Sequence, residues 1–204
     1  MKSLKTTDSK ERRSLSREEF TLLLNASHQL EREHPERKGQ TIIWRFLVNT
    51  GLRIDEFIHL QWSDIDFRRG VIKIQRKQGW DPKTYGREVP FTPESEAILR
   101  EIKPTQAKSD SYVFKTMRGK GQIRQTVIRR WLLECAERAE IDGMRGPHDL
   151  RHTFITWGLT EFGIDIPTMQ KIAGHKQLQT TQIYVHATTA HASKAMKGFG
   201  QQTE

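Results

Sequence analysis

Cysteine is almost absent from this sequence: Cys135 is the only one among 204 residues, so no disulfide can form within the chain. It stands among apolar and helix-forming residues, which favours a buried structural thiol over a reactive one. No apolar run approaches the roughly 20 residues of a membrane-spanning helix. The first 13 residues are almost entirely polar and contain no secretion-signal pattern. We therefore expect a soluble protein without a membrane partner, in a reducing compartment such as the cytoplasm of a bacterial or phage-host cell.

Acidic residues are outnumbered: 25 Asp and Glu face 34 Lys and Arg, a net charge of +9. This excess indicates a polyanionic partner, with nucleic acid the first candidate and an anionic membrane surface the second. Two stretches are nearly free of acids, residues 68–87 and residues 115–131. Both suggest phosphate contacts, the second by Lys115, Arg118, Lys120, Arg124, Arg129 and Arg130. A solvated basic face is the alternative for both stretches.

Apolar periodicity predicts a mainly helical domain with one small antiparallel sheet of three strands, an α+β fold. Ser16 and Glu19 have the spacing of a capping box and indicate the first helix. Further helices are expected at 42–52, 53–60, 93–102, 123–139, 149–162, 167–172 and from 188 onward. Strands are expected at 64–67, 71–75 and 87–92, with a long loop over 76–86. Residues 1–15 are interpreted as a basic, disordered arm before a single domain over 16–204.

Three segments hold residue types that suit chemistry at a phosphate. The first, TGLRIDEF, contains Arg53 and, three positions later, Glu56. The second, HDLR, contains His148 and Arg151. The third begins AGH and contains His175, with Tyr184 nine positions further on. Each motif alone is weak, but their order along nearly the whole chain resembles the signature boxes of the tyrosine recombinases, the phage integrase family.

The resemblance implies the catalytic-domain fold of that family and a site-specific recombinase activity. In such enzymes a tyrosine attacks the scissile phosphate, forms a 3′-phosphotyrosyl link and releases a 5′ hydroxyl. A 5′ hydroxyl from a partner duplex then attacks the link. The bond energy is kept in the covalent intermediate, so no cofactor, ATP or metal is expected.

Arginine suits the clamp that such chemistry needs, because its planar fork donates two parallel hydrogen bonds and stays charged. We assign this role to Arg53 and Arg151, which would stabilise charge on the phosphate oxygens in the transition state. Glu56 lies one helical turn after Arg53 and is expected to orient a clamp residue. For that pair taken alone, a surface ion pair is the alternative.

Tyr184 is the expected nucleophile, and it needs a base because a free tyrosine has a pKa near 10. His148 is the candidate general base, and His175 is expected to donate a hydrogen bond to the phosphate. The alternatives are a core tyrosine and structural histidines, the interpretation we give to His152. Histidines 148, 152 and 175 could in principle bind zinc, but no glutamate accompanies them, and no metal is expected.

The family's general acid is a lysine on the loop between the second and third strands. Here that loop holds Lys77 and Lys83, and KTYGREVP resembles the family's pattern around that lysine. The pattern favours Lys83 over Lys77 but does not fix a position on a loop of variable length.

The chain departs from the family at its N-terminus, since only 15 residues precede the expected first helix and no separate N-terminal DNA-binding domain is evident. It is either a natural single-domain recombinase or a fragment. We expect double-stranded DNA as partner, with a monomer in solution and a tetramer on paired sites. Residues 188–200 have a weak apolar face that could dock on a neighbour or on its own domain. A type IB topoisomerase and a DNA-binding protein without catalysis remain as rival functions.

Overall fold

The computed structural model describes residues 13–83, 86–116 and 121–174, and within them the predicted fold class is confirmed. The helices are α1 (Arg17–Glu33), α2 (Gln40–Thr50), α3 (Ile54–Ile58), α4 (Pro93–Ile102), α5 (Gln125–Arg138), α6 (Pro147–Thr160) and α7 (Ile166–Ala173). Two short 3-10 turns cover Pro35–Arg37 and Trp62–Asp64. Strands β1 (Ile65–Asp66), β2 (Val71–Ile74) and β3 (Arg87–Pro90) form an antiparallel sheet in that order.

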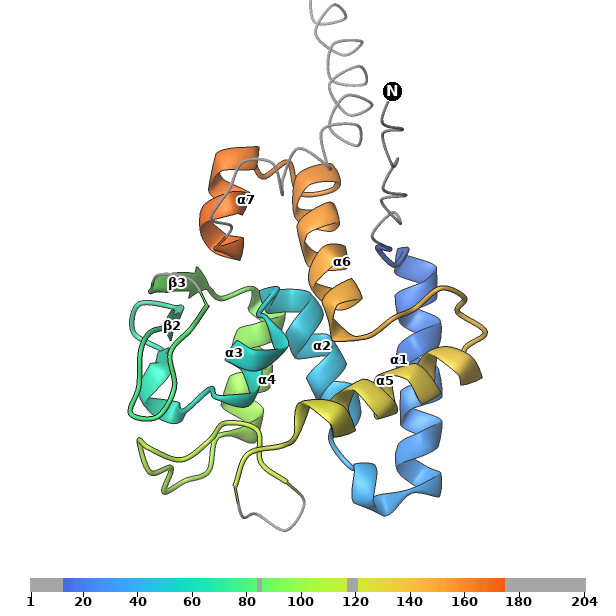
Figure 1. The fold of residues 1–204 in the computed structure, drawn as a ribbon, viewed down its shortest axis with the longest axis horizontal. Coiled ribbons are helices and arrows are strands. Elements are labelled where there is room, and N and C mark those ends of the chain that lie inside the picture. Colours follow the sequence, from blue (N-terminus) through green and yellow to red (C-terminus); the bar gives the residue numbers. More distant parts are fainter. Residues whose placement is uncertain (1–12, 84–85, 117–120, 175–204) are drawn as a thin grey trace, which may run out of the picture.

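Helix α2 is the centre of the domain and packs against α1, α4, α5 and α6 (Figure 1). Trp44 and Phe46 of α2 are fully buried, and Phe46 meets Phe57 and Phe114 in a cluster of rings with centroids 4.4–6.1 Å apart. Full burial of each such ring stabilises the fold by about 1.5–3 kcal/mol. The sheet and α7 lie to one side of this core, and α1 and α5 lie to the other (Figure 1).

Local sequence explains where the helices begin and end. The Ser16–Glu19 capping box is present at the start of α1, as predicted. Thr92 caps α4, which begins at Pro93, a residue suited to the first helical position. Helix α2 ends at Gly51, whose φ of 59° is left-handed. A Cβ at Gly51 would lie 2.2 Å from the Phe154 ring, so the tight packing of α2 on α6 also requires glycine.

The register of the sheet decides which side chains of β3 face the core. Ile72 pairs with Val89, and Ile74 pairs with Arg87. Because side chains alternate along a strand, Arg87 shares the inner face of the sheet with Val89. Both isoleucines and Val89 are buried. A charged residue therefore projects from β3 toward the interior of the domain.

The expected boundary of the N-terminal arm at residue 15 needs correction. Leu15 is only 2 % exposed, and its main chain is bound to α6 at both polar atoms. Its N–H donates to Thr153 Oγ1 at 2.9 Å, and its carbonyl accepts from Trp157 Nε1 at 3.0 Å. The packed domain thus begins before Ser16, while residues 1–12 lie outside the described part of the chain.

Smaller differences from the predictions concern element ends. Helix α2 starts two residues earlier than expected, and the strands are shorter, with β1 reduced to Ile65–Asp66. Cys135 is fully buried, as predicted, and burial raises the pKa of its thiol to about 11. In the described ranges, no helix is both long and apolar enough to cross a membrane.

Candidate active site

The first signature segment lies at the junction of α2 and α3, where the chain turns. Arg53 is the N-cap of α3, and its backbone N–H donates to Glu56 Oε2 at 2.9 Å. The Arg53 side chain returns to the same carboxylate, with Nη1 donating to Oε1 at 3.0 Å. The side chain of Glu56 is 1 % exposed, so this pair is not a surface ion pair. The carboxylate holds both the main chain and the guanidinium of Arg53.

Glu56 has a second arginine partner that the sequence reasoning did not assign. Arg87 Nη1 and Nη2 donate to the two Glu56 carboxylate oxygens at 2.7 and 2.8 Å. Burial raises the pKa of Glu56, but the hydrogen bonds and charge of Arg87, with those of Arg53, outweigh it and hold the pKa below its usual value. Glu56 is thus an ionised carboxylate between two arginines.

Three arginines meet at the C-terminal end of α7. Arg87 Nε donates to the carbonyl of Ile172 at 2.8 Å, Arg151 Nη2 to that of Ala173 at 2.6 Å, and Arg53 Nη2 to that of Gly174 at 2.8 Å. The last carbonyls of a helix lack partners within the helix and carry partial negative charge, so cationic donors suit them. The end of α7 therefore fixes all three guanidinium groups relative to one another.

Gly174 has no substitute at this point. Its φ of 68° lies in the left-handed region, and a Cβ there would stand 2.8 Å from Arg87 Cδ. The chain leaves α7 here and continues to His175, which lies outside the described residues together with Tyr184. Gly174 thus places the start of the third signature segment directly against Arg53 and Arg87.

Helix α6 brings the second box to the same place. Arg151 is 4 % exposed, and besides Ala173 its Nη1 reaches the carbonyl of Gly51 at 2.5 Å. His148, one turn earlier, is exposed. His152, interpreted as structural, is 5 % exposed, with its ring centroid 6.4 Å from that of His148. No group of three or more His, Cys, Asp or Glu suited to a metal occurs in the part of the chain that was searched, which leaves out His175.

A cavity of about 240 Å³ lies between the first signature segment, the second signature segment and the β2–β3 loop. Its walls include Arg53, Glu56, Lys83 and His148, together with Gln125 at the start of α5. These residues come from α3, the β2–β3 loop, α5 and α6. The structure therefore gathers the expected clamp arginine Arg53, general base His148 and general acid Lys83 around one space.

The two candidate lysines of the β2–β3 loop have different surroundings. Lys77 forms an ion pair with Asp64, whose side chain is fully buried, and donates to the carbonyl of His59 at 2.5 Å. Trp80 stacks on His59 with centroids 4.7 Å apart and closes this side of the loop. Lys83 is exposed and faces the cavity. Of the two lysines, Lys83 lines the cavity and Lys77 is paired with a buried carboxylate.

Most bases of the stretch 68–87 are paired with carboxylates, four of which lie outside the stretch. Five of its seven bases form ion pairs: Arg69–Glu88, Lys73–Asp66, Arg76–Asp81, Lys77–Asp64 and Arg87–Glu56. Our interpretation of this stretch as a run of phosphate contacts therefore applies at most to Arg68 and Lys83. The charge count along the sequence did not reveal pairing across the sheet.

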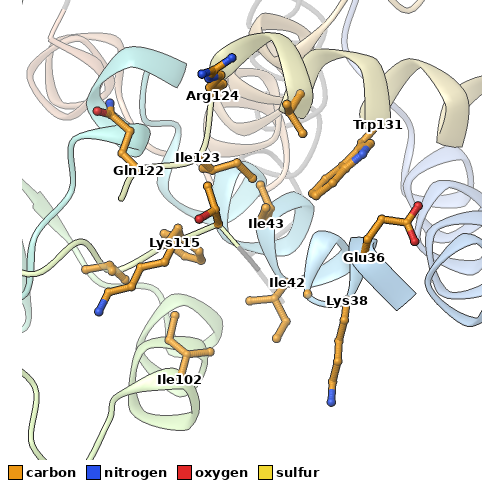
Figure 2. A pocket seen from close by; sticks show the side chains of 15 residues that line it. Glu36, Lys38, Ile42, Ile43, Ile102, Lys115, Gln122, Ile123, Arg124 and Trp131 are labelled. Atoms are coloured by element: carbon orange, nitrogen blue, oxygen red, sulfur yellow. The ribbon is translucent and has the colours of Figure 1, made fainter. Parts of the chain in front are cut away.

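The predicted DNA-binding residues that can be described lie along α5 and just before it. Lys115 and Arg124 line a second hollow of about 640 Å³, whose lining also includes Ile42, Ile43 and Ile102 (Figure 2). Arg129 packs beside Gly146, and Arg130 is exposed, 4.0 Å from Glu134. Arg118 and Lys120 lie outside the described residues. Gln125, the residue after Arg124, lines the smaller cavity described above.

Comparison with known proteins identifies the family to which the chain is similar. The sequence profile of the phage integrase family matches residues 13–191. Tyrosine recombinase XerA of Thermococcus kodakarensis is 30 % identical over 91 % of the chain and 62 % of its own length. XerC of Oceanobacillus iheyensis is 36 % identical over 73 % of the chain and 49 % of its own length, and XerD of Proteus mirabilis is 38 % identical over 70 % and 46 %.

Solved structures give the same answer for the fold. A crystal structure of XerA recombinase superposes with a TM-score of 0.68 at 27 % identity, over 94 % of this chain and 66 % of that one. The Tn1549 transposon integrase, solved with transposon right-end DNA, superposes with a TM-score of 0.73 at 22 % identity, over 94 % and 67 %. The chain spans about half to three fifths of the length of the curated relatives named above. The family match covers most of the chain, and the chain belongs to the phage integrase family of tyrosine recombinases.

Proposed function

We propose that this protein is a site-specific DNA recombinase that cleaves and rejoins DNA strands through a 3′-phosphotyrosyl intermediate on Tyr184. The observation that carries the proposal is the cavity lined by Arg53, Lys83 and His148, with Arg151 and Arg53 bound to the adjacent carbonyls of Ala173 and Gly174. A binding protein without catalysis has no use for this convergence of proton-transfer groups and buried arginines. The curated relatives named above are also tyrosine recombinases.

Arg53 and Arg151 would stabilise the charge that develops on the phosphate oxygens. A guanidinium has five N–H donors. In Arg53 and Arg151 some of these donors bind main-chain carbonyls and so fix the orientation of the guanidinium plane. Donors fixed in advance need no reorganisation when the reaction occurs, and this is the main source of electrostatic catalysis. His175 would supply a further hydrogen bond to the phosphate.

Two proton transfers accompany the phosphoryl transfer. As Tyr184 Oη forms its bond to phosphorus, His148 accepts the tyrosine proton; as the bond from phosphorus to the 5′ oxygen breaks, Lys83 gives that oxygen a proton. In the second step the 5′ hydroxyl of a partner strand attacks phosphorus and Tyr184 leaves. One ester bond replaces another in each step, so the sequence balances without metal or ATP.

A type IB topoisomerase would use the same cavity but would rejoin the original strand. The test is a pool of nicked duplexes with a randomised centre, in which the nick traps the covalent protein–DNA adduct after cleavage. Sequencing the trapped DNA identifies a site, and two differently labelled duplexes carrying it are then mixed with the protein. Joined products of mixed label are expected. Relaxation of supercoiled plasmid without mixed products would favour the topoisomerase.

Assembly is part of the proposal. We propose a monomer in solution and a tetramer on paired sites, coupled by residues 188–200. Sedimentation of the protein with the selected site should show a multi-protomer complex on paired sites. Deletion from residue 188 onward should keep binding to a single site but remove that complex. A truncated protein that still assembles and joins strands would exclude this segment as the coupling element.

A further inference from the structure

We infer that Arg87 is a positioning residue for strand cleavage: it holds the Glu56 carboxylate against the end of α7, and thereby sets the orientation of Arg53. The inference rests on the proposed recombinase function. Arg87 stands in the KTYGREVP segment, but the sequence analysis gave it no role, and it is not among the residues that line the cavity. It would act through other groups and not on the phosphate itself.

All three nitrogens of the Arg87 guanidinium donate hydrogen bonds. Nη1 and Nη2 bind Glu56 at 2.7 and 2.8 Å, and Nε binds the carbonyl of Ile172 at 2.8 Å. The side chain is 7 % exposed. This is the bidentate fork that a lysine cannot reproduce, because an ammonium is a point charge without a fixed plane. The charge of Arg87 and its shape can therefore be tested separately.

Arg87 and Arg53 share one carboxylate oxygen. Glu56 Oε1 accepts from Arg87 Nη1 at 2.7 Å and from Arg53 Nη1 at 3.0 Å. Glu56 Oε2 accepts from Arg87 and also from the backbone N–H of Arg53. Any rotation of the carboxylate that follows loss of the fork therefore moves both anchors of Arg53 together.

The other end of Arg87 reaches the segment that leads to the catalytic third box. The carbonyl of Ile172 binds Arg87 and the carbonyl of Gly174 binds Arg53, and both residues are among the last described before His175. Arg87 also begins β3, four positions after Lys83. The buried Arg87 side chain thus binds the carboxylate that holds Arg53 and the helix end that leads to the third signature segment. Its strand also continues from the loop that carries Lys83.

The sheet offers a matched control. Arg69 binds Glu88 with two bonds of 2.6 and 2.8 Å, a fork of the same kind on the same sheet. Its side chain is 49 % exposed, and neither Arg69 nor Glu88 is among the residues that line the cavity. Arg69→Lys therefore makes the same chemical change away from the site.

The experiment measures single-turnover formation of the covalent adduct at saturating nicked duplex, and duplex affinity in parallel. Arg87→Lys should slow adduct formation on the order of tenfold or more, less than removal of a direct transition-state donor, which costs about a hundredfold. Duplex affinity and the rate of Arg69→Lys should stay within about twofold of the wild type. If the wild-type protein forms no adduct, the proposed function fails; if it does and Arg87→Lys is equally fast, this inference alone fails.

A double variant separates positioning from simple support of the fold. If Arg87 acts through Arg53, adding Arg87→Lys to Arg53→Ala should slow the reaction by no more than about twofold further. A fully additive loss would overturn the inference. Should Arg87→Lys fold poorly, Arg87→Met with Glu56→Gln replaces the buried pair by neutral groups and should recover thermal stability. That variant should remain slow, and recovery of the wild-type rate would show that Arg87 only supports the fold.

Discussion

Arg53 Nη2 donates a 2.8 Å hydrogen bond to the carbonyl oxygen of Gly174, a residue 121 positions away in the sequence. The bond joins the first signature box to the residue just before His175. Arg87 and Arg151 bind the two preceding carbonyls. The end of α7 therefore binds and orients side chains from three separate segments of the chain. A substitution that distorts this helix end should affect the whole site.

The role of Lys83 can be tested with a modified substrate. If Lys83 protonates the leaving 5′ oxygen, Lys83→Ala should cleave an ordinary duplex at least about a hundredfold slower, the lower range for general acid catalysis. A duplex with sulfur at the 5′ bridging position needs no acid, since a thiolate leaves without help, and should be cleaved nearly as fast as by the wild type. Rates on the two substrates provide the measurement. A variant equally slow on both would remove Lys83 from this role.

Lys77 should show the opposite pattern, a loss of stability. Lys77→Ala leaves the fully buried Asp64 carboxylate without its ion-pair partner, and breaking a buried pair from one side destabilises a protein by about 3–5 kcal/mol. Urea unfolding followed by circular dichroism measures the change. Sulfur rescue by Lys77→Ala with unchanged stability would reverse the two assignments.

Glu56 gives a prediction for acid pH. In the folded protein the pKa of Glu56 is lower than its usual value of 4.5, because the hydrogen bonds and charges of Arg87 and Arg53 outweigh the effect of burial. A carboxylate with a depressed pKa stabilises the fold above its unfolded pKa and loses this contribution as pH falls through the folded pKa. Glu56→Gln should therefore unfold more easily than the wild type at neutral pH. The difference in unfolding free energy should narrow below pH 4.5. A difference that stays constant into that range would contradict the assignment.

Arg151 should affect both stability and catalysis. Arg151→Lys keeps the charge but cannot reach both Gly51 and Ala173, and a buried carbonyl left unsatisfied costs about 1–3 kcal/mol. The unfolding free energy should fall by that amount and adduct formation by about a hundredfold. Arg53→Lys, at a more exposed site, should lose rate with a smaller loss of stability. Equal stability losses for both variants would argue against this division.

Local signals in the sequence were enough for much of the fold. The apolar period predicted α4 with the bounds observed, and the spacing of Ser16 and Glu19 predicted the cap of α1. These features depend on residues within one or two turns of each other. The motifs likewise indicated Arg53, Lys83 and His148, which the structure brings to one cavity.

What the sequence left open depends on contacts between distant residues. Arg87 stands at the start of the expected third strand, and no pattern in the sequence pairs it with Glu56. The pattern favoured Lys83 over Lys77 without fixing the position, and the contact of Lys77 with the buried Asp64 could not be read from the sequence. Leu15 looked like part of a polar arm because its partners, Thr153 and Trp157, lie on α6.

The central claim is that Tyr184 is the nucleophile, and a trapped adduct tests it directly. The wild-type protein is incubated with a nicked duplex carrying its site, the adduct is digested, and the peptide that retains the nucleotide is identified by mass spectrometry. The account predicts a phosphodiester bond on Tyr184, no adduct from Tyr184→Phe with duplex binding unchanged, and normal adduct formation by Tyr85→Phe and Tyr112→Phe. An adduct formed by Tyr184→Phe, or a nucleotide on either of the other tyrosines, would contradict it.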